Sequence, residues 1–316
     1  MQKLSVGNGE EELNVEGLYE MFITSKKSAG VSPYTLDYYE RCFISFKKYF
    51  DTTQPCSAIN LKVIEGYILN MKDNPKITDI SINSNLRGVR VFVYYGIESE
   101  YISPFKIHLI RAEKKIKETY TENELVLLLK KPNKKNCSFA EYRNWVIINY
   151  LLATGNRLET LVNIKNGDIN FSEYEISLLK TKNKTQYIIP MSLELTKILR
   201  EYLLYRKGTD DDYLFCSSYG KKLDKRTLQD QIKQYNKTRG VLKTSIHAFR
   251  HTFAKHWVLN GGDMFSLQNL LGHSSLEMVK EYVEMFSNDI KIGFNMHNPL
   301  DIIMKKNSKG DWIKMK

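Results

Sequence analysis

Residues 144–157 read NWVIINYLLATGNR, and this stretch defines the centre of the expected fold. Up to Ala153 it is apolar on nearly every face of a helix, which is typical of a helix buried on all sides. Gly155 then permits a sharp turn, because glycine adopts backbone angles closed to other residues. Arg157 follows, near the domain interior, where a guanidinium needs an anion. That anion is either a carboxylate of the protein or a ligand.

Short strands are predicted after this helix. The segments DINF, YEISLL and YIIP, between Asp168 and Pro190, alternate or run apolar with turns between them. This pattern predicts a small three-stranded antiparallel sheet, after which helical patterns resume. On the N-terminal side, Thr121 and Glu124 form a capping-box pattern, so this domain begins near Tyr120. The fold class expected is therefore mainly α with a small antiparallel β-sheet.

A separate helical unit precedes this domain. Residues 15–27 have apolar side chains at helical spacing, and Ser32 and Pro33 form the start of a second helix. Two more helices are predicted, at about 58–71 and about 80–100. The expected domain organisation is a flexible N-terminus, a helical domain, a basic linker, a second domain and a tail, at residues 1–14, 15–105, 106–118, 119–288 and 289–316.

The composition is that of a folded globular protein, with 42% hydrophobic and 26% charged residues in a chain of 316. No apolar run is long enough to cross a bilayer, and residues 1–14 lack the apolar core of a signal peptide. Four cysteines without CxxC pairing favour a reducing compartment and no zinc ribbon. We therefore expect a cytoplasmic protein without a membrane partner.

The net charge of +11 suggests a polyanionic partner. Such an excess is useful to a nucleic-acid-binding protein, because neutralising phosphates releases counterions. Residues 106–135 carry nine Lys or Arg against four Glu, a local charge of +5. A charge run is often only a solvated face, and between two domains of a DNA-binding protein it could instead contact the phosphate backbone. Charge alone favours nucleic acid only slightly.

The segment HAFRHTFA places His247 and Arg250 three residues apart on one side of a predicted helix. This pair suits a phosphodiester, because the arginine can bind two oxygens while the histidine handles a proton. His251 and His256 add further imidazoles, and His247 with His251 has the spacing of a metal-binding pair. No HExxH motif or third ligand accompanies them, so no metal is expected.

A third cluster, LLGHSS at residues 270–275, is followed by Tyr282, nine residues after His273. Taken alone, this tyrosine is interpreted as a core residue. However, ATGNR, HAFRHTFA and LLGHSSLEMVKEYV, in this order, resemble the sequence boxes of the tyrosine recombinase (phage integrase) family, and SPYTLDYY resembles the start of its core-binding domain. The resemblance runs from about Val15 to about Asn288. It implies a helical, SAM-like core-binding domain and a mixed α/β catalytic domain that form a clamp around DNA.

The resemblance also implies a catalytic role for five of these residues. Arg157 and Arg250 would clamp the scissile phosphate. His247 would act as general acid or base, His273 would donate a hydrogen bond to the same phosphate, and Tyr282 would be the nucleophile. Attack would give a 3′-phosphotyrosyl bond and a 5′-hydroxyl, with strand exchange through a Holliday junction. No metal, cofactor or ATP is expected to take part.

A lysine completes the family's set. It lies in a β-hairpin, which here reads LLKTKNKTQYIIP, residues 178–190. Counting back from Pro190, Lys182 matches best, and Lys180 and Lys184 are the alternatives. An ammonium group on a flexible stem is suited to protonate the leaving 5′-oxygen.

Two positions near Arg157 depart from the family pattern. Asn156 stands where the family often has leucine, and Thr160 stands where it has a carboxylate. We expect Glu159 or another group to support the active site in place of that carboxylate. No reacting residue is lost, so activity is expected to survive.

The resemblance implies double-stranded DNA with inverted-repeat core sites as the partner, bound by a homotetramer and associated with the nucleoid. Too few residues precede Val15 for an arm-binding domain, which favours a Xer-like or mobile-element recombinase. The tail carries apolar residues that pack on their own domain or, as we favour, on a neighbouring protomer: Phe294, Leu300, Ile302 and Ile303.

Three other functions compete with this one. A type IB topoisomerase shares the residues and the covalent intermediate, although the helical N-terminal domain and the tail favour a recombinase. A catalytically inactive accessory DNA-binding protein would need neither Tyr282 nor Lys182. A metal-dependent nuclease would need a carboxylate cluster, which the sequence does not present.

Overall fold

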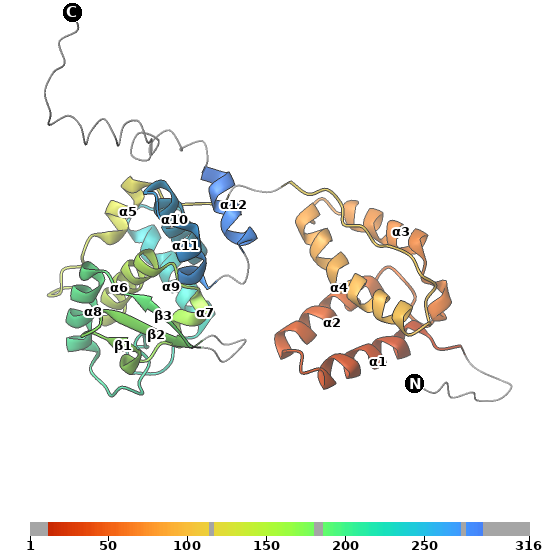
Figure 1. Cartoon of the computed structure of the whole chain (residues 1–316), viewed down its shortest axis with the longest axis horizontal. Coiled ribbons are helices and arrows are strands. Elements are labelled where there is room, and N and C mark those ends of the chain that lie inside the picture. Colours follow the sequence, from red (N-terminus) through yellow and green to blue (C-terminus); the bar gives the residue numbers. More distant parts are fainter. Residues whose placement is uncertain (1–11, 114–116, 180–185, 273–275, 287–316) are drawn as a thin grey trace, which may run out of the picture. The chain divides into compact units, whose positions relative to one another are not determined.

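The computed structural model, shown in Figure 1, describes four stretches of the chain: residues 12–113, 117–179, 186–272 and 276–286. Four groups of predicted features lie outside these stretches: residues 1–11 of the expected flexible N-terminus, Lys182 with its alternatives, His273, and the tail at 289–316. The chain divides into two compact units, Met1–Lys115 and Ile116–Lys316, each with its own hydrophobic core. They are called unit 1 and unit 2 below.

Unit 1 is helical in its described residues. It consists of α1 (Val15–Ser28), α2 (Pro33–Lys47), α3 (Leu61–Lys72) and α4 (Asp79–Glu98), with a 3₁₀ turn at Cys56–Ala58. Helix α4 packs against the other three. The core between them is rich in aromatic rings, among them Phe22, Phe43 and Phe92.

The helices of unit 1 begin at capping residues that the sequence supplies. Ser32 accepts a hydrogen bond from the Thr35 amide, and Pro33 occupies the first turn, as predicted. The third helix begins at Leu61, later than the expected residue 58. The reason is that the Asn60 side chain accepts from the Val63 amide and thereby fixes the helix start.

Unit 2 is built around α6 (Phe139–Thr154), which packs against α5 (Glu122–Leu129), α8 (Leu193–Arg206), α9 (Lys225–Thr238) and α10 (Ile246–Leu259). Nearly every face of α6 is buried, so the predicted central helix is confirmed. It begins at Phe139 rather than at residue 144, because Ser138 caps it. Glu124 and Thr121 form the predicted capping box of α5.

The sheet of unit 2 is antiparallel, in the order β1 (Ile169–Asn170), β2 (Glu175–Leu179) and β3 (Gln186–Pro190). Ile176 and Ile189 face each other across the ladder and both are buried, so one face of the sheet joins the core. The expected fold class, mainly α with a small antiparallel sheet, is confirmed.

The C-terminal part of unit 2 adds α11 (Met264–Leu271) and α12 (Glu277–Phe286) beside α10, as Figure 1 shows. The short helix α7 (Leu158–Leu161) and a 3₁₀ turn at Asn166–Asp168 lie between α6 and β1 in the chain. Helices α10, α11 and α12 enclose a second, small core in which Tyr282 is buried. Among the described helices, none is long and apolar enough to span a membrane.

A buried arginine that the sequence analysis did not single out holds the start of α6 in place. Arg143 is 1% exposed. Its Nη1 donates to the Cys216 carbonyl at 2.8 Å, and its Nη2 donates to Asn144 Oδ1 at 2.9 Å and to Gln231 Oε1 at 2.5 Å. The guanidinium therefore ties α6 to α9 and to the strand-like segment at Cys216 through neutral oxygens alone.

Candidate active site

The turn after α6 brings two arginines together. Helix α6 ends at Gly155, whose φ of 61° lies in the left-handed region. A Cβ at this position would lie 2.5 Å from the Phe253 ring and 2.9 Å from Leu271, so glycine is required for space as well as for conformation. The Gly155 carbonyl accepts a hydrogen bond from Arg250 Nη1 at 2.9 Å, and Arg157 follows two residues later.

Arg157 and Arg250 converge on one carbonyl oxygen. Arg157 Nη1 lies 3.1 Å from the Leu271 oxygen and 3.3 Å from that of Gly272, and Arg250 Nη2 donates to the Leu271 oxygen at 2.8 Å. These partners, at the end of α11, are neutral carbonyls. Within the described stretches, the hydrogen bonds of Arg157 therefore go to backbone carbonyls and not to a carboxylate.

The electrostatics of the pair favour a bound anion. Arg250 is 5% exposed, and its pKa falls to about 10, first because of burial and then because of the charge on Arg157. Two neighbouring cations with little access to water repel each other, and an anion between them would relieve this cost. A phosphodiester oxygen has the charge and the geometry that two guanidinium groups bind best.

His247 lies beside the two arginines. Burial lowers its pKa first, and the charges of Arg250 and Arg157 lower it further. It stands three residues before Arg250 on α10, so both side chains project from the same side of that helix. The structure thus brings His247, Arg157 and Arg250 together, as the sequence predicts.

Tyr282 comes from α12 and completes the described part of the cluster. Its side chain is 2% exposed, and its hydroxyl lies 2.9 Å from His251 Nδ1. Its contact with His251 is not predicted by the sequence, where His251 stands only as a further imidazole or a metal ligand. The sequence does contain a signal for this contact: His251 lies one turn after His247 on α10 and next to Arg250.

A lysine from the predicted linker also lies against the tyrosine. Lys117 Nζ is 4.5 Å from the centroid of the Tyr282 ring and 2.7 Å from the Glu281 carboxylate. Lys117 stands 165 positions before Tyr282 in the sequence, so no local pattern could have indicated this contact. A cation over an aromatic ring and an ion pair together fix the face of α12 that carries the tyrosine.

The two departures from the family pattern are explained by local contacts. Asn156 is buried and donates from its amide to the Tyr150 hydroxyl at 2.6 Å. Glu159 pairs with Lys225 and accepts from Asn163 at the surface, and the expectation that Glu159 or another group replaces the carboxylate stays a prediction. Thr160 hydrogen-bonds with the Tyr187 hydroxyl, and the charges of Arg157 and Arg250 act on that same phenol.

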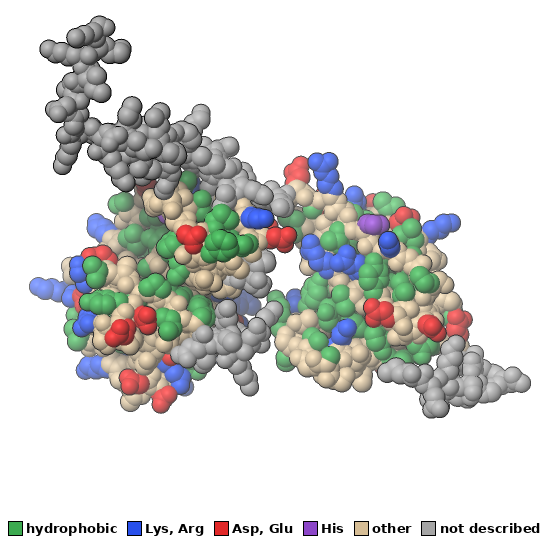
Figure 2. Space-filling model, in the orientation of Figure 1, with side chains coloured by type: hydrophobic (Ala, Val, Ile, Leu, Met, Phe, Trp, Pro, Cys, Tyr) green, Lys and Arg blue, Asp and Glu red, His purple; other side chains and the backbone are tan. Residues whose placement is uncertain are grey.

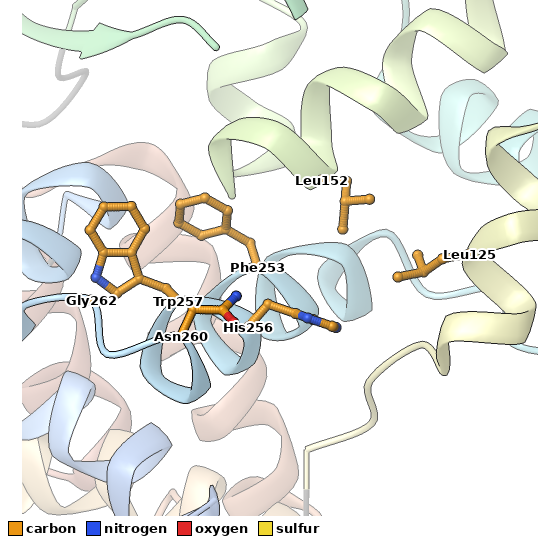
Figure 3. Close-up of a pocket in the computed structure, with 7 residues that line it drawn as sticks. All are labelled: Leu125, Leu152, Phe253, His256, Trp257, Asn260 and Gly262. Carbon is orange, nitrogen blue, oxygen red and sulfur yellow. The ribbon is translucent and has the colours of Figure 1, made fainter. Parts of the chain in front are cut away.

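Helix α10 also lines an apolar pocket of about 430 Å³, shown in Figure 3. His256, the third imidazole noted in the sequence, borders this pocket instead of joining His251 and Tyr282. Within the described stretches, no three His, Cys, Asp or Glu side chains are grouped to hold a metal ion. The other residues around the pocket are Leu125, Leu152, Phe253, Trp257, Asn260 and Gly262.

A family model described as the Phage integrase family matches residues 118–288. The chain is 28% identical over 244 residues to tyrosine recombinase XerC of Chlamydia caviae, covering 74% of this chain and 77% of the relative. It is 25% identical over 284 residues to tyrosine recombinase XerD of Oceanobacillus iheyensis, covering 85% of this chain and 94% of the relative.

Two kinds of solved structure share the fold. The Tn1549 transposon integrase, in complex with circular intermediate DNA, superposes with a TM-score of 0.70 at 23% identity, covering 86% of this chain and 95% of that one. A lambda integrase dimer bound to a core site superposes with a TM-score of 0.68 at 17% identity, covering 84% and 97%.

The chain belongs to the phage integrase family of tyrosine recombinases. Its function is site-specific DNA recombination, in which the enzyme cleaves and rejoins DNA strands.

Proposed function

We propose that the residues gathered between α6, α10 and α12, together with two residues outside the described stretches, form the catalytic site of this recombinase. Arg157 and Arg250 clamp the scissile phosphate, with His247 beside them as an acid or base. Tyr282 attacks the phosphorus. The two further members of the set are Lys182, which protonates the leaving 5′-oxygen, and His273, which donates a hydrogen bond to the phosphate.

One observation carries this assignment. Two guanidinium groups share the Leu271 carbonyl, and Arg250 also hydrogen-bonds with the buried Tyr282 hydroxyl. An anion bound by both arginines would therefore sit next to the nucleophile. Negative charge grows on the phosphate oxygens as a pentavalent transition state forms, and fixed cations stabilise it without reorganising.

The covalent product of the first step is a 3′-phosphotyrosyl bond with a free 5′-hydroxyl. The energy of the broken phosphodiester stays in this link, so a 5′-hydroxyl of a partner strand can reverse the step without ATP. Two such exchanges, separated by a Holliday junction, complete recombination.

We further propose that residues 15–105 form a core-binding domain, 106–118 a linker and 119–288 the catalytic domain, which close around the duplex as a clamp. Figure 2 shows Lys and Arg side chains on the drawn face of both units, with Asp and Glu between them. The Tn1549 integrase is in complex with circular intermediate DNA, and the lambda integrase dimer is bound to a core site, which supports a DNA partner. The duplex would carry inverted-repeat core sites.

The active assembly is proposed to be a homotetramer on DNA, associated with the nucleoid in the cytoplasm. A lambda integrase of this fold forms a tetramer on a Holliday junction, which supports this state. The apolar residues of the tail at 289–316 would dock on a neighbouring protomer. A mobile-element or Xer-like role fits the two-unit layout. A chain ending at residue 288 should then bind one DNA half-site normally and fail to form tetramers.

The test of the catalytic proposal begins with the target site. Purified protein selects its site from a library of random duplexes, and that site is made as a nicked suicide substrate. Wild type, Tyr282→Phe and the control Tyr219→Phe, at an exposed position, are incubated with it without metal. We expect a covalent adduct on a denaturing gel from wild type and the control only. An equal adduct from Tyr282→Phe would overturn the assignment.

A second assay separates a recombinase from a topoisomerase. Two labelled duplexes carrying the selected site are mixed with the enzyme, and exchange of their flanking arms is measured. Exchanged arms are expected. Relaxation of supercoils without exchange would favour a type IB topoisomerase, and binding without any adduct would favour an accessory DNA-binding protein.

A further inference from the structure

Two polar neighbours of the Tyr282 hydroxyl come from α10. His251 Nδ1 lies 2.9 Å from the phenolic oxygen, and the two rings are 5.7 Å apart. Arg250, the adjacent residue, also hydrogen-bonds with Tyr282, and this bond raises the pKa of the arginine against the larger effect of burial. The nucleophile is thus held between a guanidinium and an imidazole.

The chemistry of these two neighbours allows the phenolic proton to lie toward His251. A guanidinium has only N–H donors, so Arg250 donates to the Tyr282 oxygen. The Tyr282 O–H can donate in turn, and His251 Nδ1 lies at hydrogen-bond distance from it as an acceptor. This arrangement requires the tautomer of His251 that carries its proton on Nε2.

The surroundings keep His251 neutral. Its pKa falls to about 4, first because of burial and then because of the charges of Lys117, His247 and Arg250, in that order. The charged and titratable groups that face it are thus Lys117 from the segment before α5, His247 and Arg250 from α10, and Tyr282 from α12. At neutral pH the Nδ1 lone pair is therefore available to accept a proton.

We propose that His251 is a catalytic residue that accepts the phenolic proton of Tyr282 as the tyrosine attacks the scissile phosphate. This inference rests on the proposed role of Tyr282 as nucleophile. In the step, the tyrosine oxygen forms a bond to phosphorus and its proton moves to His251 Nδ1, giving an imidazolium. The bond from phosphorus to the 5′-oxygen breaks, and the leaving oxygen takes a proton from Lys182. Rejoining reverses both transfers.

The bound substrate makes this transfer easier. A phosphate held by Arg157 and Arg250 brings a negative charge that offsets the cations beside His251. The pKa of His251 should therefore rise when DNA binds, which makes the imidazole a better base when it is needed. His247 remains the group beside the phosphate, while the contact with the nucleophile belongs to His251.

The test compares His251→Gln with the control His256→Gln, which changes the same residue type on the same helix at the apolar pocket. Glutamine can still accept a hydrogen bond from Tyr282 but is not a base. On the nicked substrate, we expect His251→Gln to form adduct about 100-fold more slowly than wild type, with unchanged DNA affinity. The control should cleave at the wild-type rate. His251→Asn should repeat the defect, and thermal melting checks that each variant is folded.

A modified substrate separates loss of the base from loss of the acid. Sulfur in place of the bridging 5′-oxygen leaves without being protonated. This substrate should restore cleavage to Lys182→Ala and leave the defect of His251→Gln. The rate of His251→Gln should also keep rising with pH, since only ionisation of the phenol itself then supplies the nucleophile.

Three results would count against this account in different ways. Cleavage by His251→Gln within twofold of wild type would overturn the role of His251, as would its rescue by the sulfur substrate. If wild type itself forms no Tyr282-dependent adduct, the proposed function fails, and the role of His251 fails with it.

Discussion

Among its described residues, unit 2 contains two buried arginines, and their surroundings differ. Arg143, at the start of α6, donates to two side-chain amide oxygens and a carbonyl. Arg250, on α10, donates to two carbonyls and shares one of them with a second arginine. In both, burial lowers the pKa of the guanidinium, but only at Arg250 does a neighbouring cation lower it further.

Under the proposed function, this difference separates a structural arginine, Arg143, from a catalytic one, Arg250. Oxygens around Arg143 balance the donors of the guanidinium, so the folded chain satisfies it alone. The pair at Arg250 places two positive charges beside a tyrosine, and in the proposed function both bind the scissile phosphate. Such strain is typical of sites that bind a charged transition state, where stability is given up for function.

The largest effect is expected at Arg250. Arg250→Met should slow adduct formation on the nicked substrate about 1,000-fold, because one fixed cation at the transition state is lost. Its free energy of unfolding should change by less than about 1 kcal/mol, since removing one of two repelling charges offsets the lost hydrogen bonds. A large loss of stability in urea would make Arg250 structural, like Arg143.

Arg143→Met should show the opposite behaviour. It leaves the oxygens of Asn144, Gln231 and Cys216 without their donor, so unit 2 should lose about 3 kcal/mol of stability. All three tryptophans lie in unit 2, so tryptophan fluorescence reports the unfolding of this unit in urea. Adduct formation per folded molecule should match wild type. A catalytic defect in folded protein would remove the contrast between the two sites.

A smaller effect is the loss of folding stability that we expect at acidic pH. The folded pKa of His251, about 4, lies below its unfolded value of about 6.5, so the unfolded chain binds the proton first. The stability tied to this group is complete above pH 6.5 and is lost as pH falls toward 4. Because the ring is only partly buried, we expect about 2 kcal/mol.

This effect is measured as a difference between two proteins, because carboxylates titrate in the same range. Wild type and His251→Gln are unfolded in urea at pH 7 and at pH 4.5. Wild type should lose more stability than the variant over this interval. Equal losses would mean that His251 is not kept neutral by its surroundings.

The smallest effect is expected at Lys117. Its ion pair with Glu281 is partly exposed, and its contact with the Tyr282 ring is a single cation–π interaction. Lys117→Met should therefore destabilise unit 2 by about 0.5 kcal/mol, with a shallower salt dependence of stability. Lys117 also lowers the pKa of His251. The Lys117→Met variant should therefore lose less stability between pH 7 and pH 4.5 than wild type does. An equal loss of stability in this variant and in wild type would contradict the effect of Lys117 on the pKa of His251.

Features that depend on local pattern could be predicted from the sequence. The central helix α6 follows from its apolar residues, the turn from Gly155, the sheet from alternating segments, and α10 from the spacing of His247 and Arg250. Each of these depends on residues that are close in the chain, and each matches the structure.

Features that depend on tertiary contacts could not be predicted. Arg143 lies within an apolar run, and its partners at residues 216 and 231 are far away in the sequence. The contact of His251 with Tyr282 and that of Lys117 with the same ring arise only when α12 packs on α10. Glu159 is expected to support the active site because it is close to Arg157 in the sequence. In the structure it lies in the first turn of α7 and pairs with Lys225.

The identity of the residue that carries the DNA is the central claim, and mass spectrometry tests it most directly. The trapped adduct is digested with trypsin and nuclease, and the modified peptide is sequenced. The account predicts a nucleotide 3′-phosphate on the peptide of residues 281–291, which contains Tyr282 as its one tyrosine. A nucleotide on any other peptide, or one joined through its 5′-phosphate, would contradict the account.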